Sequence, residues 1–422
     1  MKLENFQTIG TIKKRKAEIS LCMIVKNEEH NIGRCLASVK DLVDEIVIVD
    51  TGSTDRTKEI VAQYTDKIYD FEWIQDFAAA RNFAFSKGTK EYLMWLDADD
   101  IIKESNKGLF LETKNFLSEH PECDWITMIY QIAHDKEGNP LYSYKRERII
   151  KRSTFGEGEN QARWLGAVHE CIQIQGAGSH SPAIVTHTKN IAEHLRDRNL
   201  KILLNKVESG KQMDTREYFY LSNELFDHQR YEECLKYYEI FFSKDDVFVE
   251  DAIAACIKAC QAGSILGNKR LAKDYAMKTF TFAPPRAEAC CLMGDFLFQE
   301  DNVRDAIFWY DLATKLVKPA DSMGGFIEDC WTWSPHVQLA ACYDRLGATD
   351  QAFVHNEIAL KFRPDHEGLN KNREMLIQKK PELKNASIKQ ATETQTLPTN
   401  TQVLNRQARR EQERQAKKLA RK

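Results

Sequence analysis

Three aspartates directly follow an apolar segment, in the order Leu96-Asp97-Ala98-Asp99-Asp100. The preceding residues, Tyr92 to Leu96, are apolar enough to form a buried strand. Burying a carboxylate is costly unless it is paired or binds a metal, so acidic residues at the end of such a strand indicate a ligand. Alternate side chains at a strand end would let one carboxylate face a ligand while another binds a divalent cation. A plain acidic loop or helix cap is the alternative, and other motifs must decide between the two.

A second carboxylate, Asp50, ends another apolar strand and leads into the turn Thr51-Gly-Ser-Thr-Asp55. It is placed to accept a hydrogen bond from the ring N–H of uracil, and Gly52 permits a close approach of the backbone. A helix cap with a tight turn is the alternative, and it fits the hydroxyl residues of the turn better than Asp50. Val25-Lys-Asn-Glu28 closes an earlier strand in a similar polar loop. Three such loops on one side of a sheet describe a nucleotide pocket.

The elements that position these residues alternate between strand and helix from about residue 18 to residue 100. The predicted strands are Ile19–Val25, Glu45–Asp50, Asp66–Tyr69 and Tyr92–Leu96, and the predicted helices are Glu28–Lys40, Arg56–Tyr64 and Phe77–Lys87. This alternation predicts an α/β domain with a parallel sheet, in which ligands bind at the carboxyl ends of the strands. Further strands, which we expect to form the acceptor side of the same domain, are predicted at Trp125–Ile132, Tyr144–Ile150 and Ile172–Gln175.

From residue 196 to residue 380 the pattern is helical and repeats. Similar offsets separate small and aromatic residues in three segments: Ser222, Leu225, Cys234, Tyr238 and Phe241; Gly294, Leu297, Ala306, Tyr310 and Ala313; Ala340, Tyr343, Ala352, Ala359 and Pro364. These offsets resemble the tetratricopeptide pattern, in which small residues lie where paired helices cross. The segment Lys318–Trp333 interrupts the period. Such arrays bind a partner or mediate dimerisation, and a homodimer through the repeats is one expectation here.

The composition describes a soluble, folded protein. Of its 422 residues, 42% are apolar and 29% are charged, and the net charge of −3 gives no basic field that would favour nucleic acid. No apolar run approaches the roughly 20 residues that a membrane helix needs, and no signal-peptide pattern is present near the N-terminus. The 11 cysteines form no CxxC pair, which favours reduced thiols and a cytoplasmic location.

The changes of pattern along the chain predict four parts. They are an N-terminal extension at residues 1–17, the α/β domain at 18–195, an all-α repeat domain at 196–380, and a disordered linker with a basic tail at 381–422. From Arg406 to Lys422 the tail carries eight basic residues and two glutamates. A solvated tail is the simpler interpretation, and contact with an anionic surface is the alternative.

Four motifs of the α/β domain occur in the order and spacing of family 2 glycosyltransferases. They are Cys22-Met-Ile-Val-Lys-Asn-Glu-Glu29, Val49-Asp-Thr-Gly-Ser-Thr-Asp55, Ala80-Arg-Asn82 and Leu96-Asp-Ala-Asp-Asp100. The resemblance extends from residue 18 to residue 190 or nearby. It implies the GT-A fold, a UDP-sugar donor, inversion of the anomeric carbon and a requirement for Mg²⁺ or Mn²⁺.

The same resemblance implies roles for individual residues of this chain. Arg81 would reach the uracil or the diphosphate, Asp97 would face the ribose or the sugar, and Asp99 would hold the metal ion. The residues implied to lie near the nucleoside are Val25, Asn27, Glu28, Asp50 and Ser53.

Two later segments add further candidates. Trp164-Leu-Gly-Ala-Val-His-Glu170 resembles the Gly-x-Val-His-Glu element of soluble family members with helical repeats. Glu170 stands where their catalytic carboxylate is expected, with His169 beside it, although a structural histidine is the alternative. Ile184-Val-Thr-His187 resembles a later strand whose histidine completes metal or diphosphate binding, and here too a structural histidine is the alternative.

Two sets of side chains have less specific interpretations. Arg146 and Arg148 alternate on a predicted strand, where they would contact the diphosphate or an acidic acceptor, although a solvated strand face is the default. Trp73, Trp95 and Trp164 could stack on a sugar, although at least one of them is expected in the core. The Gln-x-x-Arg-Trp signature and the Glu-Asp base of membrane polysaccharide synthases are missing, which argues against processive synthesis.

The combination of an N-terminal family 2 domain with helical repeats resembles the peptide glycosyltransferases that modify Cys or Ser of glycosylated bacteriocins. It implies transfer of a hexose, usually glucose from UDP-glucose, to sulfur or oxygen. Enzymes that act on lipooligosaccharide cores or other glycans share this architecture, so a glycan acceptor stays open.

Two other classes of function also stay open. The first is a repeat scaffold with an inactive nucleotide-binding domain, against which the intact Arg81, Asp97 and Asp99 argue. The second is a nucleotidyltransferase, which should carry a Gly-rich phosphate loop near its N-terminus. Val25-Lys-Asn-Glu28 lacks such a loop.

Overall fold

The computed structural model describes residues 15–158, 160–188 and 197–386. The chain divides into two compact units, one of Met1–Phe296 with Lys315–Trp331 and one of Leu297–Thr314 with Thr332–Lys422. Most of the predicted N-terminal extension and of the predicted basic tail lies outside the described residues. The domain limits predicted from the sequence stay predictions.

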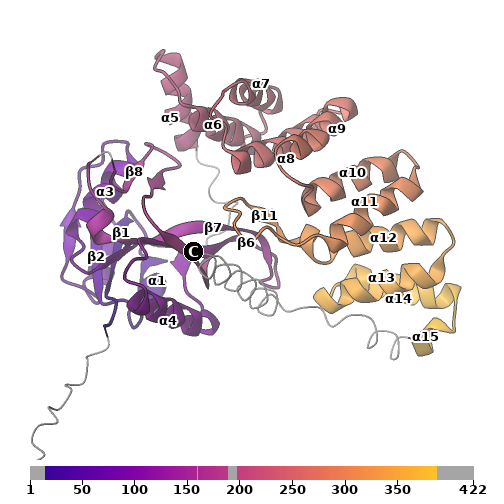
Figure 1. The fold of residues 1–422 in the computed structure, drawn as a ribbon, viewed down its shortest axis with the longest axis horizontal. Helices are drawn as coiled ribbons and strands as arrows, with labels where there is room; N and C mark the ends of the chain where they lie inside the picture. Colours follow the sequence, from indigo (N-terminus) through magenta and orange to yellow (C-terminus); the bar gives the residue numbers. More distant parts are fainter. Residues whose placement is uncertain (1–14, 159, 189–196, 387–422) are drawn as a thin grey trace, which may run out of the picture. The chain divides into compact units, whose positions relative to one another are not determined.

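Within the described residues, the first unit contains a sheet of nine strands (Figure 1). Their order is β3-β2-β1-β4-β7-β6-β10-β5, and β11 also pairs with β7, while β8 and β9 form a separate pair. The strands are β1 Ile19–Val25, β2 Glu45–Asp50, β3 Ile68–Asp70, β4 Tyr92–Met94, β5 Asp100–Ile101, β6 Trp125–His134, β7 Pro140–Lys151, β8 Arg163–Leu165, β9 Cys171–Gln173, β10 Gly178–His187 and β11 Phe326–Ile327.

The parallel half of the sheet has the arrangement that the alternation of strand and helix predicted. β1 and β2 have the predicted limits, because both are continuous apolar runs buried on both faces. β1 pairs in parallel with β2 and with β4, and Val25 lies beside Asp50 in the register. The carboxyl ends of β2, β1 and β4 therefore lie at one edge of the sheet.

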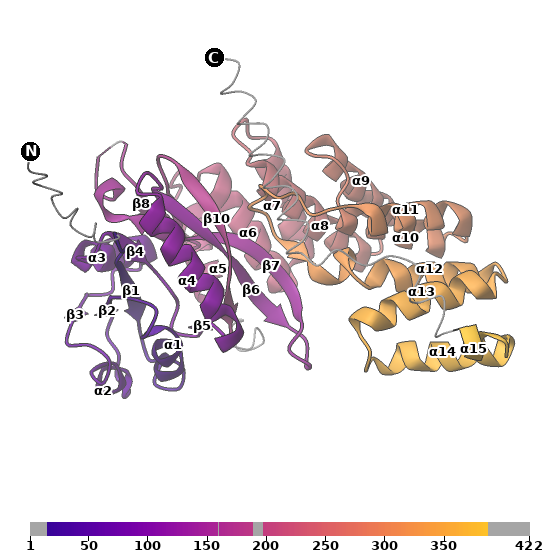
Figure 2. The same cartoon turned by 60° about the horizontal axis from the view of Figure 1, so that its bottom comes forward.

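Helices cover both faces of this half of the sheet (Figure 2). They are α1 Ile32–Val39, α2 Thr57–Val61, α3 Phe77–Lys87 and α4 Glu104–Glu119. One core cluster joins β1 to α1 and α4, and a second joins β2 to α3, β8 and β9. α3 begins at the predicted residue because Asp76 caps it, accepting from the N–H of Ala79 at 2.9 Å. α1 begins later than predicted, which leaves the residues from 26 to 31 in the loop after β1.

The antiparallel half consists of β7 between β4 and β6, with β10 beyond β6. β6 and β7 extend past their predicted limits, and β10 begins well before the predicted segment at Ile184. His187 at the end of β10 pairs with Asp100 of β5. This antiparallel pairing brings the later histidine to the aspartates that follow β4.

The chain then continues as helices, and a tetratricopeptide-like array is confirmed (Figure 1). Buried Ser222, Cys234, Ala306 and Ala352 occupy the repeated small positions, as the offsets predicted. The helices are α5 Asp197–Glu208, α6 Thr215–Asp227, α7 Tyr231–Phe242, α8 Val249–Ile265, α9 Lys269–Lys278, α10 Ala287–Gln299, α11 Val303–Lys315, α12 Ser334–Arg345, α13 Thr349–Phe362, α14 Glu367–Lys379 and α15 Leu383–Ala386. No helix in the described part of the chain is both long and apolar enough to cross a membrane.

The segment that interrupts the repeat period joins the nine-stranded sheet. Its strand β11, Phe326–Ile327, pairs in antiparallel with Ser143 and Tyr142 of β7. Glu288 of α10 accepts from the N–H of Ile327 at 2.9 Å and from the indole N–H of Trp331 at 2.5 Å. This contact could not be predicted from the sequence, because a two-residue strand has no measurable period.

Candidate active site

Two polar loops hold each other in place at the carboxyl ends of β1 and β2. The backbone N–H of Asn27 donates to the hydroxyl of Ser53 at 2.9 Å, and the side-chain oxygen of Asn27 accepts from the N–H of Thr54 at 2.8 Å. Asn27 has φ of 54°, a left-handed conformation that asparagine adopts more readily than most residues. The backbone N–H of Glu28 donates to Thr57 at 2.8 Å. The residues implied to lie near a nucleoside are thus gathered at one edge of the sheet.

Asp50 lies at the centre of this edge and is 1% exposed. Its Oδ1 accepts from the N–H groups of Gly52 and Ser53, each at 2.8 Å. Its Oδ2 is buried and has no hydrogen-bond partner among the described residues. A buried carboxylate oxygen without a partner is destabilising, so this atom is suited to accept from the N–H group of a ligand. Gly52, with φ of 99°, leaves open space where a side chain would stand.

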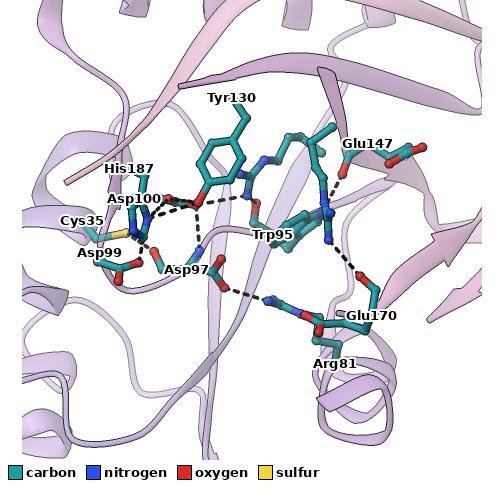
Figure 3. Close-up of polar contacts among 12 residues, drawn as sticks. Cys35, Arg81, Trp95, Asp97, Asp99, Asp100, Tyr130, Glu147, Glu170 and His187 are labelled. Atoms are coloured by element: carbon teal, nitrogen blue, oxygen red, sulfur yellow. Dashed lines mark hydrogen bonds and ion pairs between the residues drawn. The ribbon is translucent and has the colours of Figure 1, made fainter. Parts of the chain in front are cut away.

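Three charged side chains, Arg81, Asp97 and Glu170, are in direct contact near the end of β4 (Figure 3). Arg81 of α3 donates from Nη2 to Oδ1 of Asp97 at 2.7 Å and from Nε to Oε1 of Glu170 at 2.6 Å. Its guanidinium lies over the rings of Trp95 and Trp164, with its central carbon 4.5 and 5.0 Å from the ring centroids. Arg81 and Glu170 are buried, whereas the side chain of Asp97 is 37% exposed. Arg81 therefore fixes two carboxylates, and Asp97 remains accessible to a ligand.

The charges around Arg81 and Asp97 keep both side chains ionised. Burial alone would raise the pKa of Asp97, but the positive charges of Arg81 and Arg148 outweigh it and hold that pKa below its usual value. Burial also opposes the charge of Arg81, yet Asp97 and Glu170 raise the pKa of its guanidinium. The ion pair between Arg81 and Asp97 is thus present across the neutral pH range.

A cluster of two aspartates and one histidine lies after β4 and at the end of β10. One ligand atom from each of Asp99, Asp100 and His187 lies within 4.8 Å of the others. Both oxygens of Asp100 are engaged, since the Tyr130 hydroxyl donates to Oδ1 at 2.9 Å and the backbone N–H of Asp97 donates to Oδ2 at 3.1 Å. Nδ1 of His187 lies 3.4 Å from Oδ1 of Asp99 and 3.4 Å from Oδ1 of Asp100, so these side chains form a group with the ligand types and spacing to hold a divalent cation.

Arg148 has a structural position that the sequence did not predict. It is 0% exposed, and its Nη1 forms an ion pair with Oδ2 of Asp100 at 3.2 Å. Its guanidinium carbon lies 3.9 Å from the Trp95 ring centroid and 4.3 Å from that of Tyr130. The default interpretation of Arg148 as part of a solvated strand face is wrong, because the aspartates after β4 and the rings around them enclose it. Arg146, in contrast, is half-buried.

Replacing Arg148 with methionine is expected to destabilise the protein by about 3–5 kcal/mol, because Asp100 would keep a buried charge without its partner. Adding Asp100→Asn should restore most of that loss, since replacing both members of a buried ion pair is often neutral. Urea unfolding measures both effects. Arg152→Met, at an exposed arginine that follows β7, is the matched control. An unchanged midpoint for Arg148→Met would contradict this role.

The tryptophans and the histidine beside Glu170 have distinct surroundings. Trp95 and Trp164 are buried, with ring centroids 5.1 Å apart in an edge-to-face contact, which agrees with a core position. His169 adopts φ of 52° and its Nε2 lies 2.8 Å from Oε1 of Glu224 on α6. Its ring stacks on Tyr220 at 4.4 Å. His169 and Glu170 thus point to opposite partners, one to the helices and one to Arg81.

The sheet and this site define a glycosyltransferase domain of the GT-A type. The chain belongs to glycosyltransferase family 2. The sequence model of that family, Glycosyl transferase family 2, matches residues 20–160. The lipopolysaccharide core biosynthesis glycosyltransferase LpsC of Rhizobium meliloti is 31% identical over 206 residues, which are 46% of this chain and 74% of LpsC.

Two further relatives match shorter parts of their own sequences. Glycosyltransferase SunS of Bacillus subtilis is 38% identical over 163 residues, which are 38% of this chain and 36% of SunS. A TPR repeat-containing protein of Synechococcus elongatus, Synpcc7942_0270, is 49% identical over 86 residues, which are 20% of this chain and 21% of that relative. The matches therefore span about a third and about a fifth of the lengths of these two proteins.

Proposed function

We propose that this protein transfers a hexose from a UDP-sugar to an acceptor, with inversion at the anomeric carbon and with a divalent cation. One observation carries the proposal. Asp50 ends β2, and Asp97 and Asp99 follow β4. Both strands neighbour β1 in parallel, so the three carboxylates lie at the same edge of the sheet. The ends of β2 and β4 are two strand spacings apart, about 10 Å, a distance that one nucleotide-sugar can span.

The donor would be held by groups whose hydrogen-bonding capacity is still unused. Oδ2 of Asp50 would accept from the N–H of uracil, next to the loops of Asn27 and Ser53. Nη1 of Arg81 is buried without a partner and is the guanidinium nitrogen left for the donor. The exposed part of Asp97 would face the ribose or the sugar.

Asp99 and His187 would hold the cation, which on binding neutralises the charge of the diphosphate leaving group. Carboxylate ligands suit Mg²⁺ and Mn²⁺, whereas imidazole prefers metals later in the first transition row. A site of one carboxylate and one imidazole therefore favours Mn²⁺ over Mg²⁺. Asp100 would orient the site, because its Oδ1 lies 3.4 Å from Nδ1 of His187 and its Oδ2 pairs with Arg148.

Glu170 would take the proton from the acceptor. Arg81 engages its Oε1, and Oε2 makes no hydrogen bond with the described residues. The free oxygen can therefore receive a proton while Arg81 keeps the side chain in position. His169 would act as a positioning residue, because Glu224 and Tyr220 hold its ring away from Arg81.

For the acceptor we propose the thiol of Cys or the hydroxyl of Ser in a precursor peptide of the bacteriocin type, with glucose as the sugar. The combination of a family 2 domain with tetratricopeptide-like helices, which resembles that of such peptide glycosyltransferases, supports this choice. The relationship to LpsC supports a lipooligosaccharide or another glycan as the second candidate. Dimerisation through the repeats and a cytoplasmic location stay predictions.

Incubation of the purified chain with Mn²⁺ and a panel of UDP-sugars tests the proposal. We expect release of UDP and, in the presence of Cys- or Ser-containing peptides, a mass increase of one hexose. Exchange of pyrophosphate would instead indicate a nucleotidyltransferase. The absence of any turnover and of any nucleotide binding would favour the scaffold with an inactive domain.

Asp50→Asn should raise the KM for the UDP-sugar by about 10- to 100-fold, the equivalent of one lost hydrogen bond to a charged group. The amide keeps an oxygen for Gly52 and Ser53 but presents an NH₂ group to the N–H of uracil. Cytosine has an acceptor at the same ring position, so the KM for the CDP-sugar should not rise. Asp70→Asn is the matched control, because Asp70 lies beside Asp50 in the β3 register and is exposed. Equal changes for both nucleotides would contradict uracil recognition by Asp50.

A further inference from the structure

A row of side chains on β7 runs away from the catalytic carboxylates. Tyr142, Tyr144, Arg146 and Arg148 alternate along the strand, so they share one face of the sheet. Their contacts agree with this, because the ring centroids of Tyr142 and Tyr144 are 6.3 Å apart and Arg146 and Arg148 both lie over Trp95. Arg148 lies at the buried end of the row, where it forms an ion pair with Asp100. From Tyr142 to Arg148 the strand spans about 20 Å.

Helix α6 presents side chains to the same region. Arg216 lies over the ring of Tyr220 at 5.6 Å, and its Nε donates to Asp251 of α8 at 3.1 Å. Tyr220 stacks on His169, which directly precedes Glu170 in the chain. Arg146 donates from Nη2 to the backbone oxygen of Glu170 at 2.8 Å. Arg146 of β7 therefore contacts the backbone of the proposed catalytic base, and Tyr220 of α6 contacts the side chain of the residue before it.

The polar groups of this region are largely unused. The hydroxyls of Tyr142, Tyr144 and Tyr220 make no hydrogen bond with the described residues, and none of them is sealed from solvent. Loss of solvation raises the pKa of all three phenols, that of Tyr220 to about 12, so they stay protonated at neutral pH. Arg146 and Arg216 each use one guanidinium nitrogen within the protein. Neither the proposed donor contacts nor the proposed cation contacts involve these five side chains.

We propose that these five residues form an acceptor platform that binds an extended polypeptide leading to Glu170. The proposal rests on the proposed function and specifies its acceptor. Phenol and guanidinium donors match the carbonyl oxygens that a peptide chain presents at every residue. The 6.3 Å between the rings of Tyr142 and Tyr144 matches the two-residue repeat of an extended chain, about 6.6 Å. The part of the peptide that flanks the Cys or Ser to be modified would then lie on β7 and α6.

The test removes the three hydroxyls and keeps the rings, in the variant Tyr142→Phe/Tyr144→Phe/Tyr220→Phe. The probe is a pool of fluorescent peptides with a central Ser or Cys and random flanks, each about 12 residues long, twice the length that spans the row. Binding measured by fluorescence anisotropy without donor should weaken by about tenfold or more, since each hydrogen bond contributes about 1 kcal/mol. Binding of UDP should change by less than about twofold, because none of the proposed donor contacts is altered.

Tyr218→Phe/Tyr237→Phe is the matched control, because these phenols lie on α6 and α7 and also lack hydrogen bonds to described residues. The platform is wrong if the triple variant binds the peptides as tightly as the wild type does. It is also wrong if the triple variant loses affinity for an oligosaccharide panel and not for the peptides, which would make the platform a glycan site. Because binding is measured without donor, a wild type that binds peptides but releases no UDP would refute the proposed function and leave the platform standing.

Discussion

Asp99→Ala is expected to lower the rate of sugar transfer by about 10³-fold or more, because a bound cation contributes several kcal/mol to stabilising a charged leaving group and each 1.36 kcal/mol is a factor of ten. His187 would then be the one remaining protein ligand of the pair. Added Mn²⁺ should not restore the rate, since the carboxylate ligand itself is missing. The rate of UDP release and the titration of activity with Mn²⁺ measure the effect.

The same substitution should leave the fold intact. Thr188 donates from its N–H at 2.9 Å and from its hydroxyl at 2.6 Å to the backbone oxygen of Asp99, and alanine keeps that oxygen. We expect the thermal midpoint to move by less than about 2 °C. Asp41→Ala, at an exposed aspartate that follows α1, is the control for loss of one acidic residue. Full metal-dependent activity of Asp99→Ala would overturn the assignment of the cation site.

Glu170→Gln should slow transfer to serine by about 10²- to 10⁴-fold, the usual contribution of a general base. Transfer to cysteine should fall less, because a thiol has a pKa near 8.5 and needs less help to lose its proton than a hydroxyl does. Glutamine keeps an oxygen that can accept from Nε of Arg81, so the arrangement of Asp97 and Arg81 should survive. Paired rates for two peptides that differ only in Ser or Cys measure the difference.

Glu112→Gln is the control for this experiment, because Glu112 is exposed on α4. Equal losses with the two acceptors would argue against Glu170 as the base. In that case its contact with Arg81 would have a structural role, and Asp97, whose side chain is 37% exposed, would become the carboxylate to test next.

Much of the parallel sheet could be predicted because its strands are continuous and apolar. β1 and β2 have the predicted limits, and α3 begins where the Asp76 cap sets it. Helix α4 was not predicted, because its first five residues, Glu104-Ser-Asn-Lys-Gly108, are polar or small and include a glycine, which has low helix propensity. α4 is stabilised by packing its buried Phe110 and Leu117 into the core of the sheet.

Distant parts of the chain that meet in space were harder to predict. The interruption of the repeats was visible as a break in the period, but its pairing with β7 depends on two residues and on Glu288. Arg148 looked like a member of an alternating, solvated row, because the sequence does not show that Trp95 and Tyr130 cover it. Loss of solvent at such positions arises from segments far away in the sequence.

The sequence by itself determined the parallel order of strand and helix, the polar loops that end β1, β2 and β4, and the helical repeats. These features follow from local propensities and periods, which neighbouring residues specify. Only the tertiary structure decided which carboxylates are available to ligands. Arg81 joins Asp97 to Glu170, which lies 73 positions later in the sequence, Arg148 forms an ion pair with Asp100, and His187 lies beside Asp99. Those assignments depend on contacts and burial between remote segments, and no local pattern encodes them.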